Sequence, residues 1–283
     1  GDVYKRQAAV WIGSHFGPGF ATGAFSVRWY VKYGWVGLVT PLLAMLITGG
    51  VMYFMLEYAR EHGTPNYRPF ARSCYGEKLG GVVAVLYDIC FLMTMMCAGG
   101  LAFSGEGKLL QGFLGVNYWA TAIITILISA ALCLYGSKLL AKSSGYLITI
   151  LLMVCLIFTL FSYTNVFDVC AETLPVMSVL NRLGMKWLQW LYVILMTLAV
   201  LTSAAGLAHA GNVRFDGLFR FIKNAQLRRF VITAILLGIA AAGAALGFQA
   251  MLQQGTSIVG WAAIPIVVIP AFTIVASKVR KAK

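Results

Sequence analysis

Charged residues are scarce in this chain, and acidic residues are the scarcest of them. Only 11% of the 283 residues are charged and nine are Asp or Glu, whereas 60% are hydrophobic. An ordinary soluble domain carries about a quarter charged residues, so this composition excludes a soluble domain of this length. The apolar runs are long enough to span a bilayer as helices. The sequence therefore predicts an all-α integral membrane protein.

Patterns that indicate catalysis or metal binding are also missing. The three histidines His15, His62 and His209 are scattered, and the apolar runs hold no paired carboxylates, no Ser/His/Asp arrangement and no phosphate-binding loop. The six cysteines show no Cys-x-x-Cys or zinc spacing, and we interpret them as small packing residues. We expect no enzymatic activity, no ATP-driven transport and no cofactor, a sodium ion excepted.

Eight apolar runs of roughly 20 residues are candidates for membrane-spanning helices. They cover about residues 8–30, 35–58, 79–104, 118–137, 144–163, 187–210, 229–251 and 257–278. Turn signals such as Gly115-Val-Asn117 and Gly211-Asn212 separate them, and residues 164–186 form a longer polar connection. We expect one transmembrane domain over residues 8–283, with about eight helices.

The basic residues predict the orientation of these helices. Most follow even-numbered runs or lie in the C-terminal tail: Arg60, Arg68, Arg72, Lys78, Lys138, Lys142, Arg214, Arg220, Lys223, Arg228, Arg229, Lys278, Arg280, Lys281 and Lys283. Because Lys and Arg concentrate in cytoplasmic loops, we expect a multi-pass protein of the cell inner (plasma) membrane with both termini in the cytoplasm. The same placement accounts for the net charge of +13 without a nucleic acid partner.

Residues 1–7 need a separate interpretation. Asp2-Val-Tyr-Lys-Arg-Gln7 resembles the translated end of a transposon adaptor used to prepare sequencing libraries. An ordinary charged flank of a membrane helix is the alternative. We interpret the segment as an adaptor-derived artefact and exclude it from reasoning about the fold. We accordingly expect the natural N-terminus to be missing.

The first apolar run contains a cluster of helix-breaking residues. Gly17, Pro18 and Gly19 are consecutive, with Gly13 and Gly23 close by. Proline removes a backbone donor and glycine lowers the cost of leaving helical geometry. Broken helices of this kind mark the substrate and ion sites of secondary transporters, whereas a kinked but continuous helix is the alternative. We favour a helix that is interrupted near Gly17–Gly19.

Two further patterns concern the shape of helices rather than chemistry. Gly243 and Gly247 form a Gly-x-x-x-Gly pattern, which is typical of close helix packing. Pro265 and Pro270 predict kinks in the last run. We assign no chemistry to these four residues.

Several stretches resemble one family of membrane proteins. Gly17-Pro-Gly-Phe-Ala-Thr-Gly23 is similar to the first-helix motif Gly-Ala-Gly-Phe-Ala-Ser/Thr-Gly of YkvI-like membrane proteins, which belong to the amino acid–polyamine–organocation superfamily. Other similar stretches are Cys97–Gly100, Glu172–Pro175, Leu198–Gly206 and Leu246–Phe248. The resemblance implies a LeuT-like fold with a broken first helix. The substrate-binding residues that it implies are Gly17, Pro18, Gly19, Phe20 and Thr22.

The chain also departs from this family. Pro18 stands where the family has Ala, and Ala24-Phe25 stands where a polar pair is common. The matches pass from the fifth family helix, at about 144–163, directly to the eighth, at about 187–210. We therefore expect helices six and seven to be absent. In the LeuT fold helix six is the inverted-repeat partner of helix one and supplies half of the substrate site.

Polar residues inside the apolar runs are candidates for an ion site. Thr202 and Ser203 occupy the place of the family's ion motif, and the resemblance implies that they bind sodium together with carbonyls freed at the first-helix break. Alternatively, such hydroxyls bond back to a carbonyl one turn earlier. Asp88 lies inside the third run, where a carboxylate must face a cavity or a partner. It is a candidate proton or cation site, and His15 is either a core residue or its partner.

These observations lead to one expected function and one alternative. We expect a secondary transporter of a small amino-acid-like or organic-cation solute, driven by sodium or protons. Its partners would be the lipid bilayer and the solute. The alternative is a non-transporting, receptor-like or truncated membrane protein of the same fold.

Overall fold

The described part of the chain is built from helices and turns and contains no strand. The structure is a computed structural model that describes residues 19, 22–64, 66–135 and 172–282. Six helical stretches in these ranges are long and apolar enough to cross a membrane: Val36–Glu61, Glu77–Leu114, Tyr118–Tyr135, Lys186–Phe215, Ala225–Ala245 and Phe248–Lys281. They correspond to six of the predicted runs, because most of run 8–30 and all of run 144–163 lie outside the described residues. The prediction of an all-α integral membrane protein is confirmed.

The chain divides into two compact units. The first unit comprises Gly1–Arg28 and Met95–Gln253, and the second comprises Trp29–Thr94 and Gln254–Lys283. Each unit is therefore assembled from segments that are distant in the sequence.

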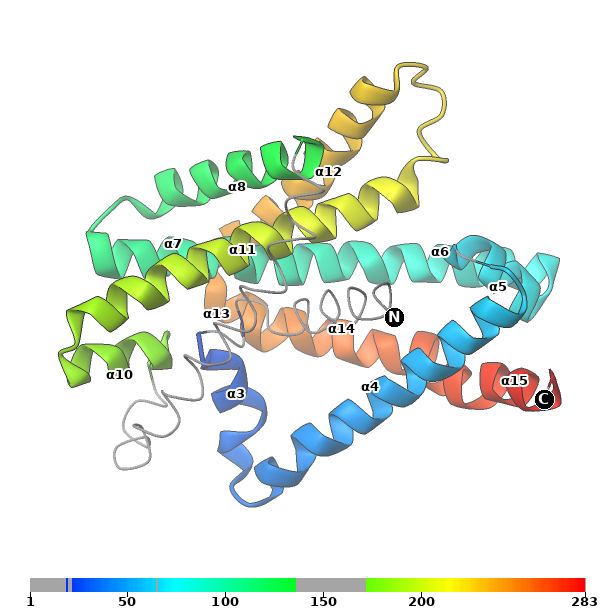
Figure 1. The fold of residues 1–283 in the computed structure, drawn as a ribbon, viewed down its shortest axis with the longest axis horizontal. Coiled ribbons are helices and arrows are strands. Elements are labelled where there is room, and N and C mark those ends of the chain that lie inside the picture. The colour runs from blue at the N-terminus through cyan, green and yellow to red at the C-terminus, as the bar shows by residue number, and fades with distance from the viewer. Residues whose placement is uncertain (1–18, 20–21, 65, 136–171, 283) are drawn as a thin grey trace. The chain divides into compact units, whose positions relative to one another are not determined.

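Four helices pack against one another in the first unit. They are α7 (Gly100–Leu114), α8 (Tyr118–Tyr135), α11 (Lys186–Phe215) and α12 (Ala225–Ala245) (Figure 1). The π-helical turn η2 (Met95–Gly99) leads into α7 and packs against α12. The fully buried side chains of this unit include Phe103, Tyr192, Met196 and Leu236. An apolar core therefore positions the polar side chains discussed below.

Asparagine side chains fix the start of two of these helices. The Asn224 Oδ1 accepts hydrogen bonds from the backbone N–H groups of Gln226 and Leu227, at 2.9 and 3.3 Å, at the start of α12. The Asn117 Oδ1 likewise accepts hydrogen bonds from the backbone N–H groups of Trp119 and Ala120, at the start of α8. An N-cap of this kind satisfies backbone donors that have no partner within the helix. The turn predicted around Asn117 is thereby confirmed.

The contact of α12 with η2 and α7 depends on glycine. A Cβ atom on Gly100 would lie 2.8 Å from the carbonyl carbon of Gly243, and one on Gly243 would overlap the carbonyl oxygen of Met96. The predicted packing role of Gly243 is therefore confirmed. Gly247, the other glycine of that pattern, instead turns the chain after α12 with φ of +91°. The prediction that both glycines serve helix packing is wrong for Gly247.

The second unit packs two long helices with shorter elements. It contains α4 (Val36–Glu61), α5 (Tyr67–Tyr75), α6 (Glu77–Thr94), α14 (Thr256–Ala263) and α15 (Ala276–Ala282). Its core includes the buried side chains of Tyr58, Phe70, Cys74 and Val275. The π-helical turn η5 (Ile264–Val268) contains Pro265. The π-helical turn η6 (Ala271–Val275) directly follows Pro270. Regular helix is thus interrupted at both prolines, as the sequence predicts.

Three predicted boundaries differ from the structure. The third run does not end at residue 104, because α6, η2 and α7 form one helical stretch to Leu114. The turn predicted at Gly211-Asn212 lies inside α11. The break expected between residues 251 and 257 is also helical, since α13 (Phe248–Ala250) and the π-helical turn η4 (Met251–Gly255) continue into α14. In each case polar residues or glycines inside a helix resembled a helix end, and packing outweighed their low helix propensity.

Candidate functional site

The backbone leaves helical geometry in the described part of the first predicted run. Gly23 has φ of +77°, a conformation that only glycine adopts without strain, and α3 (Ala24–Trp29) begins one residue later. A Cβ atom on Gly23 would also lie 3.0 Å from Cγ2 of Val176. The interruption predicted near Gly17–Gly19 stays a prediction, because Gly17 and Pro18 lie outside the described residues.

Thr22 stands at this break and is fully buried. Its hydroxyl donates a hydrogen bond to the carbonyl of Gly19 at 3.0 Å. Its own carbonyl accepts a hydrogen bond from the N–H of Val176 at 3.2 Å, at the start of α10 (Pro175–Leu183). Gly19 and Thr22, two predicted substrate-binding residues, are therefore joined by a hydrogen bond, and Thr22 lies beside the N-terminus of α10. The other three, Gly17, Pro18 and Phe20, lie outside the described residues.

The predicted sodium ligands Thr202 and Ser203 lie half-buried in α11. The Thr202 hydroxyl lies 2.9 Å from the carbonyl oxygen of Leu198 and 3.1 Å from that of Ala199, both in its own helix. This is the bonding pattern named above as the alternative to a sodium site. The carbonyls from His15 to Pro18 lie outside the described residues, so the sodium site stays a prediction.

Asp88, the other predicted ion-binding residue, belongs to the second unit and forms an ion pair with Arg68 there. Nη2 of Arg68 lies 2.9 Å from Oδ2 of Asp88, and the hydroxyl of Tyr67 donates to Oδ1. The Tyr67 hydroxyl also accepts a hydrogen bond from Arg68, which raises the pKa of the guanidinium above its usual value. Of the two environments expected for this carboxylate, a cavity or a partner, the structure provides a partner. Thr202 and Ser203 belong to the first unit.

Glu106 in α7 has the most unusual environment among the described acidic residues. Its side chain has no exposed surface. Oε1 lies 2.6 Å from the Thr197 hydroxyl of α11, within hydrogen-bond distance, while Oε2 is buried without a hydrogen-bond partner in the described part of the chain. Burying an ionised carboxylate without a cation is expensive, and such residues in membrane helices are usually functional.

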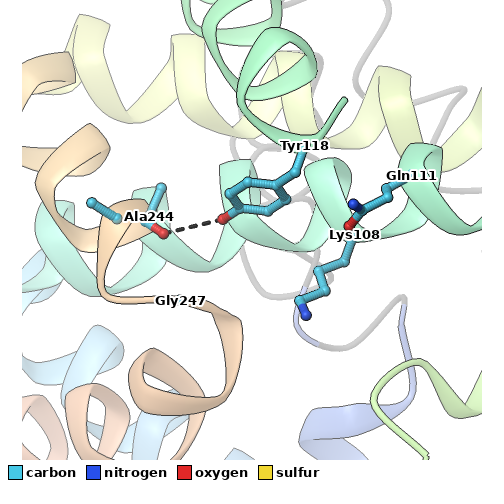
Figure 2. Close-up of a pocket in the computed structure, with 6 residues that line it drawn as sticks. Lys108, Gln111, Tyr118, Ala244 and Gly247 are labelled. Atoms are coloured by element: carbon cyan, nitrogen blue, oxygen red, sulfur yellow. Dashed lines mark hydrogen bonds between the residues drawn. The ribbon is translucent and has the colours of Figure 1, made fainter. Parts of the chain in front are cut away.

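A cavity of about 210 Å³ lies further along α7. Its lining consists of Lys108, Gln111, Tyr118, Ala244, Ala245 and Gly247. Figure 2 shows Tyr118 reaching toward Ala244, whose carbonyl accepts a hydrogen bond from the tyrosine hydroxyl at 3.1 Å. The Tyr118 ring also covers Gly107, where a Cβ atom would lie 2.7 Å from the ring. The cavity therefore lies against α7 at Lys108 and Gln111, and Glu106 does not line it.

A second buried polar cluster joins α8, α11 and α12. The Asn212 side-chain amide donates to the Thr233 hydroxyl at 2.7 Å and lies 3.5 Å from the sulfur of Cys133. Oδ1 of Asn212 is buried without a hydrogen-bond partner among the described residues. Its amide nitrogen also lies 3.3 Å from the Ala208 carbonyl of its own helix. This cluster holds three helices together, and it contains no ionisable oxygen.

Neither Glu106 nor Asn212 was predicted to be buried. The third run was predicted to end at residue 104, which placed Glu106 in the following loop. A usable signal was present, because the apolar residues Leu109, Leu110, Phe113 and Leu114 continue the run to Gly115. A longer run would have placed a carboxylate inside a membrane helix, which is a functional-site hypothesis by default.

Comparison with known proteins supports a similarity to one membrane protein. Over 157 residues the chain is 23% identical to "Uncharacterized membrane protein YkvI" of Bacillus subtilis (strain 168). The alignment covers 54% of this chain and 43% of the relative, so the chain spans less than half the length of the protein that it matches. No family model and no solved structure match the chain. The chain is thus a membrane protein similar to YkvI.

Proposed function

We propose that the protein is a secondary transporter of a small amino-acid-like or organic-cation solute, coupled to sodium or protons. The observation that carries the proposal is the break at Gly23 beside the buried Thr22. Broken helices at membrane depth expose backbone groups that recognise solutes and ions. The motif around this break is also one of the two more specific resemblances to the YkvI-like proteins, the other lying in Leu198–Gly206.

The proposal includes a LeuT-like fold within the amino acid–polyamine–organocation superfamily, in the cell inner membrane with both termini in the cytoplasm. Solute would contact Gly17, Pro18, Gly19, Phe20 and Thr22, and sodium would contact Thr202 and Ser203. The proposal assigns the protein no enzymatic activity and no nucleic acid partner. Its basic loops would face lipid head groups instead.

The experiment is uptake into proteoliposomes that contain the purified protein. An inward sodium or proton gradient is imposed, and labelled amino acids, choline and putrescine are offered in turn. Gradient-driven accumulation of any of them supports the proposal. The Gly23→Val variant is expected to lose most of this uptake, because valine at a positive φ is strained by about 1–3 kcal/mol and its side chain would meet Val176.

Gly34→Ala is the matched control. Gly34 also has a positive φ, +58°, but it is exposed, and a Cβ atom added to it would have no other atom within 4 Å. Strain at this turn is expected to leave uptake unchanged. Equal losses in both variants would show that backbone strain in general, rather than the break at Gly23, controls the activity.

A non-transporting, receptor-like or truncated protein of the same fold is the second candidate function. It is favoured by the expected absence of helices six and seven, because helix six supplies half of the substrate site in the LeuT fold. In that case a solute would stabilise the protein against heat without being accumulated. Binding without uptake under every gradient would support this candidate and overturn the transporter.

A further inference from the structure

The hydrogen bond between Glu106 and Thr197 indicates the protonation state of Glu106, because the Thr197 hydroxyl has too few hydrogens for all its contacts. The Thr197 hydroxyl has one hydrogen but lies within bonding distance of two oxygens, Oε1 of Glu106 at 2.6 Å and the carbonyl of Val193 at 2.9 Å. Threonine in a membrane helix usually donates to the carbonyl one turn earlier. If Thr197 donates to Val193, the contact with Glu106 needs its hydrogen from the carboxyl group.

The surroundings of Glu106 also favour the neutral carboxyl. An ionised carboxylate at a site without solvent contact requires a cation or several donors. Within the described part of the chain, Thr197 is the residue that bonds to Glu106, and no ion pair includes Glu106. A neutral carboxyl leaves only a carbonyl-type oxygen at Oε2 without a partner, which costs far less than a buried charge.

The charged groups on the elements around α7 lie elsewhere. Lys108, on α7 itself, is exposed and lines the cavity. The titratable groups of the elements packed against α7 are Cys97 in η2, Tyr118, Cys133 and Tyr135 in α8, Lys186, Tyr192, His209 and Arg214 in α11, and Arg228 and Arg229 in α12. None of these side chains forms a hydrogen bond or ion pair with Glu106 in the described structure. The cationic ones lie near helix ends or are exposed.

We propose that Glu106 is the proton carrier of this protein: it holds a proton in the conformation described and releases it to water when the contact between α7 and α11 opens. The step is the loss of H⁺ from the carboxyl O–H, which leaves a carboxylate on Glu106 and gives the proton to water. This inference rests on the transport function proposed above and names the proton as its coupling ion.

In the proposed step, water reaches this carboxyl through the opened contact between α7 and α11, because Glu106 does not line the cavity beside α7.

The test on the wild-type protein is infrared difference spectroscopy in lipid between neutral and alkaline pH. A protonated carboxyl has a C=O stretching band that carboxylates lack, and exposed Asp and Glu side chains are ionised at neutral pH. We expect this band in the wild-type protein at neutral pH, and we expect it to disappear at alkaline pH. Absence of the band at neutral pH would overturn the inference without any variant.

Substitutions identify the residue that gives rise to the infrared band. Glu106→Gln, which has the shape of the neutral carboxyl, should remove the band, whereas Glu77→Gln should keep it, because Glu77 begins the same long helix with a side chain that is 84% exposed. Thr197→Val should shift the band toward a carboxyl without a hydrogen bond, and Thr197→Ser should restore it. If Glu106→Gln keeps the band, another acid carries the proton. Disappearance of the band on adding sodium at constant pH would show that Glu106 binds sodium instead.

Transport separates the inference from the proposed function. In proteoliposomes, Glu106→Gln should lose accumulation driven by a proton gradient but keep the exchange of solute across the membrane. Proton-driven uptake that is unaffected by Glu106→Gln would overturn the inference and leave the transporter standing. If the wild-type protein shows the infrared band but takes up no solute, protonation of Glu106 stands and the proposed function falls.

Discussion

Hydroxyl side chains and carboxylates in membrane helices obtain their bonding partners in different ways. Thr94, Thr125 and Thr202 each donate to a carbonyl one turn earlier in their own helix, at 2.8 to 2.9 Å. A carboxylate cannot do this, because it has no hydrogen to donate and the helix offers only carbonyl acceptors. Asp88 is neutralised by Arg68, and a proton is the corresponding solution that we propose for Glu106.

The sodium site implied by the family resemblance gives a prediction at the scale of residues. Sodium should raise the thermal stability of the protein relative to potassium or choline, because a ligand that binds only the folded state stabilises it. The double variant Thr202→Ala, Ser203→Ala should abolish this increment, since it removes both hydroxyl ligands. The melting temperature in each salt is the measurement.

Asp88→Asn is the control for this prediction. Asp88 is bonded to Arg68 in the second unit, so its loss should lower stability in every salt and leave the sodium increment intact. A full sodium increment in the double variant would mean that sodium binds elsewhere. The two hydroxyls would then serve only their own helix, as the bonding of Thr202 to Leu198 allows.

The existence of helices was easier to predict from the sequence than their ends. Six of the predicted runs lie mainly in long helical stretches, because long apolar stretches must satisfy their backbone internally in lipid, although Gly247 interrupts the run 229–251. The positions of the helix ends depend on tertiary contacts. Asn212 lies inside α11, where its side-chain amide donates a hydrogen bond to Thr233 of α12. Glu106 lies inside α7, where its carboxyl group contacts the Thr197 hydroxyl of α11. The sequence around Asn212 or Glu106 does not reveal these partners, because each partner belongs to another helix. The glycine-rich motif did indicate a departure from helix in the first run, where Gly23 has a positive φ, whereas no pattern in the sequence indicated the environment of Glu106.

The contact of α12 with η2 and α7 gives a prediction at the scale of elements. Gly243→Ala should destabilise the protein by about 1–3 kcal/mol, the usual cost of overpacking, because the added methyl group would overlap the Met96 carbonyl. Gly238→Ala, in the same helix, is the control: it has no atom within 4 Å of the added carbon and should be neutral or stabilising by up to about 1 kcal/mol. Thermal or denaturant unfolding in detergent measures both. Equal effects of the two variants would contradict close packing at Gly243.

At the scale of the whole molecule, the number of membrane crossings can be tested by parity. Between Asn117 and Lys223 the described candidate spans are α8 and α11, while α10 has nine residues and is too short to cross. The predicted run at 144–163 lies outside the described residues. If it crosses the membrane, Asn117 and Lys223 lie on opposite sides; without it, they lie on the same side. An absent pair such as helices six and seven does not alter this parity.

Cysteine labelling in cells decides between these cases. In a variant with all six native cysteines replaced by Ala, a membrane-impermeant maleimide should label Asn117→Cys in intact cells. It should label Lys223→Cys only after permeabilisation, because the basic loop around Lys223 is predicted to be cytoplasmic. Lys281→Cys is the control, since α12 and the stretch Phe248–Lys281 are two further candidate spans and return it to the side of Lys223. Labelling of Asn117→Cys and Lys223→Cys on the same side would show that residues 144–163 do not cross. Opposite sides with Lys223→Cys outside would keep the crossing and reverse the predicted orientation.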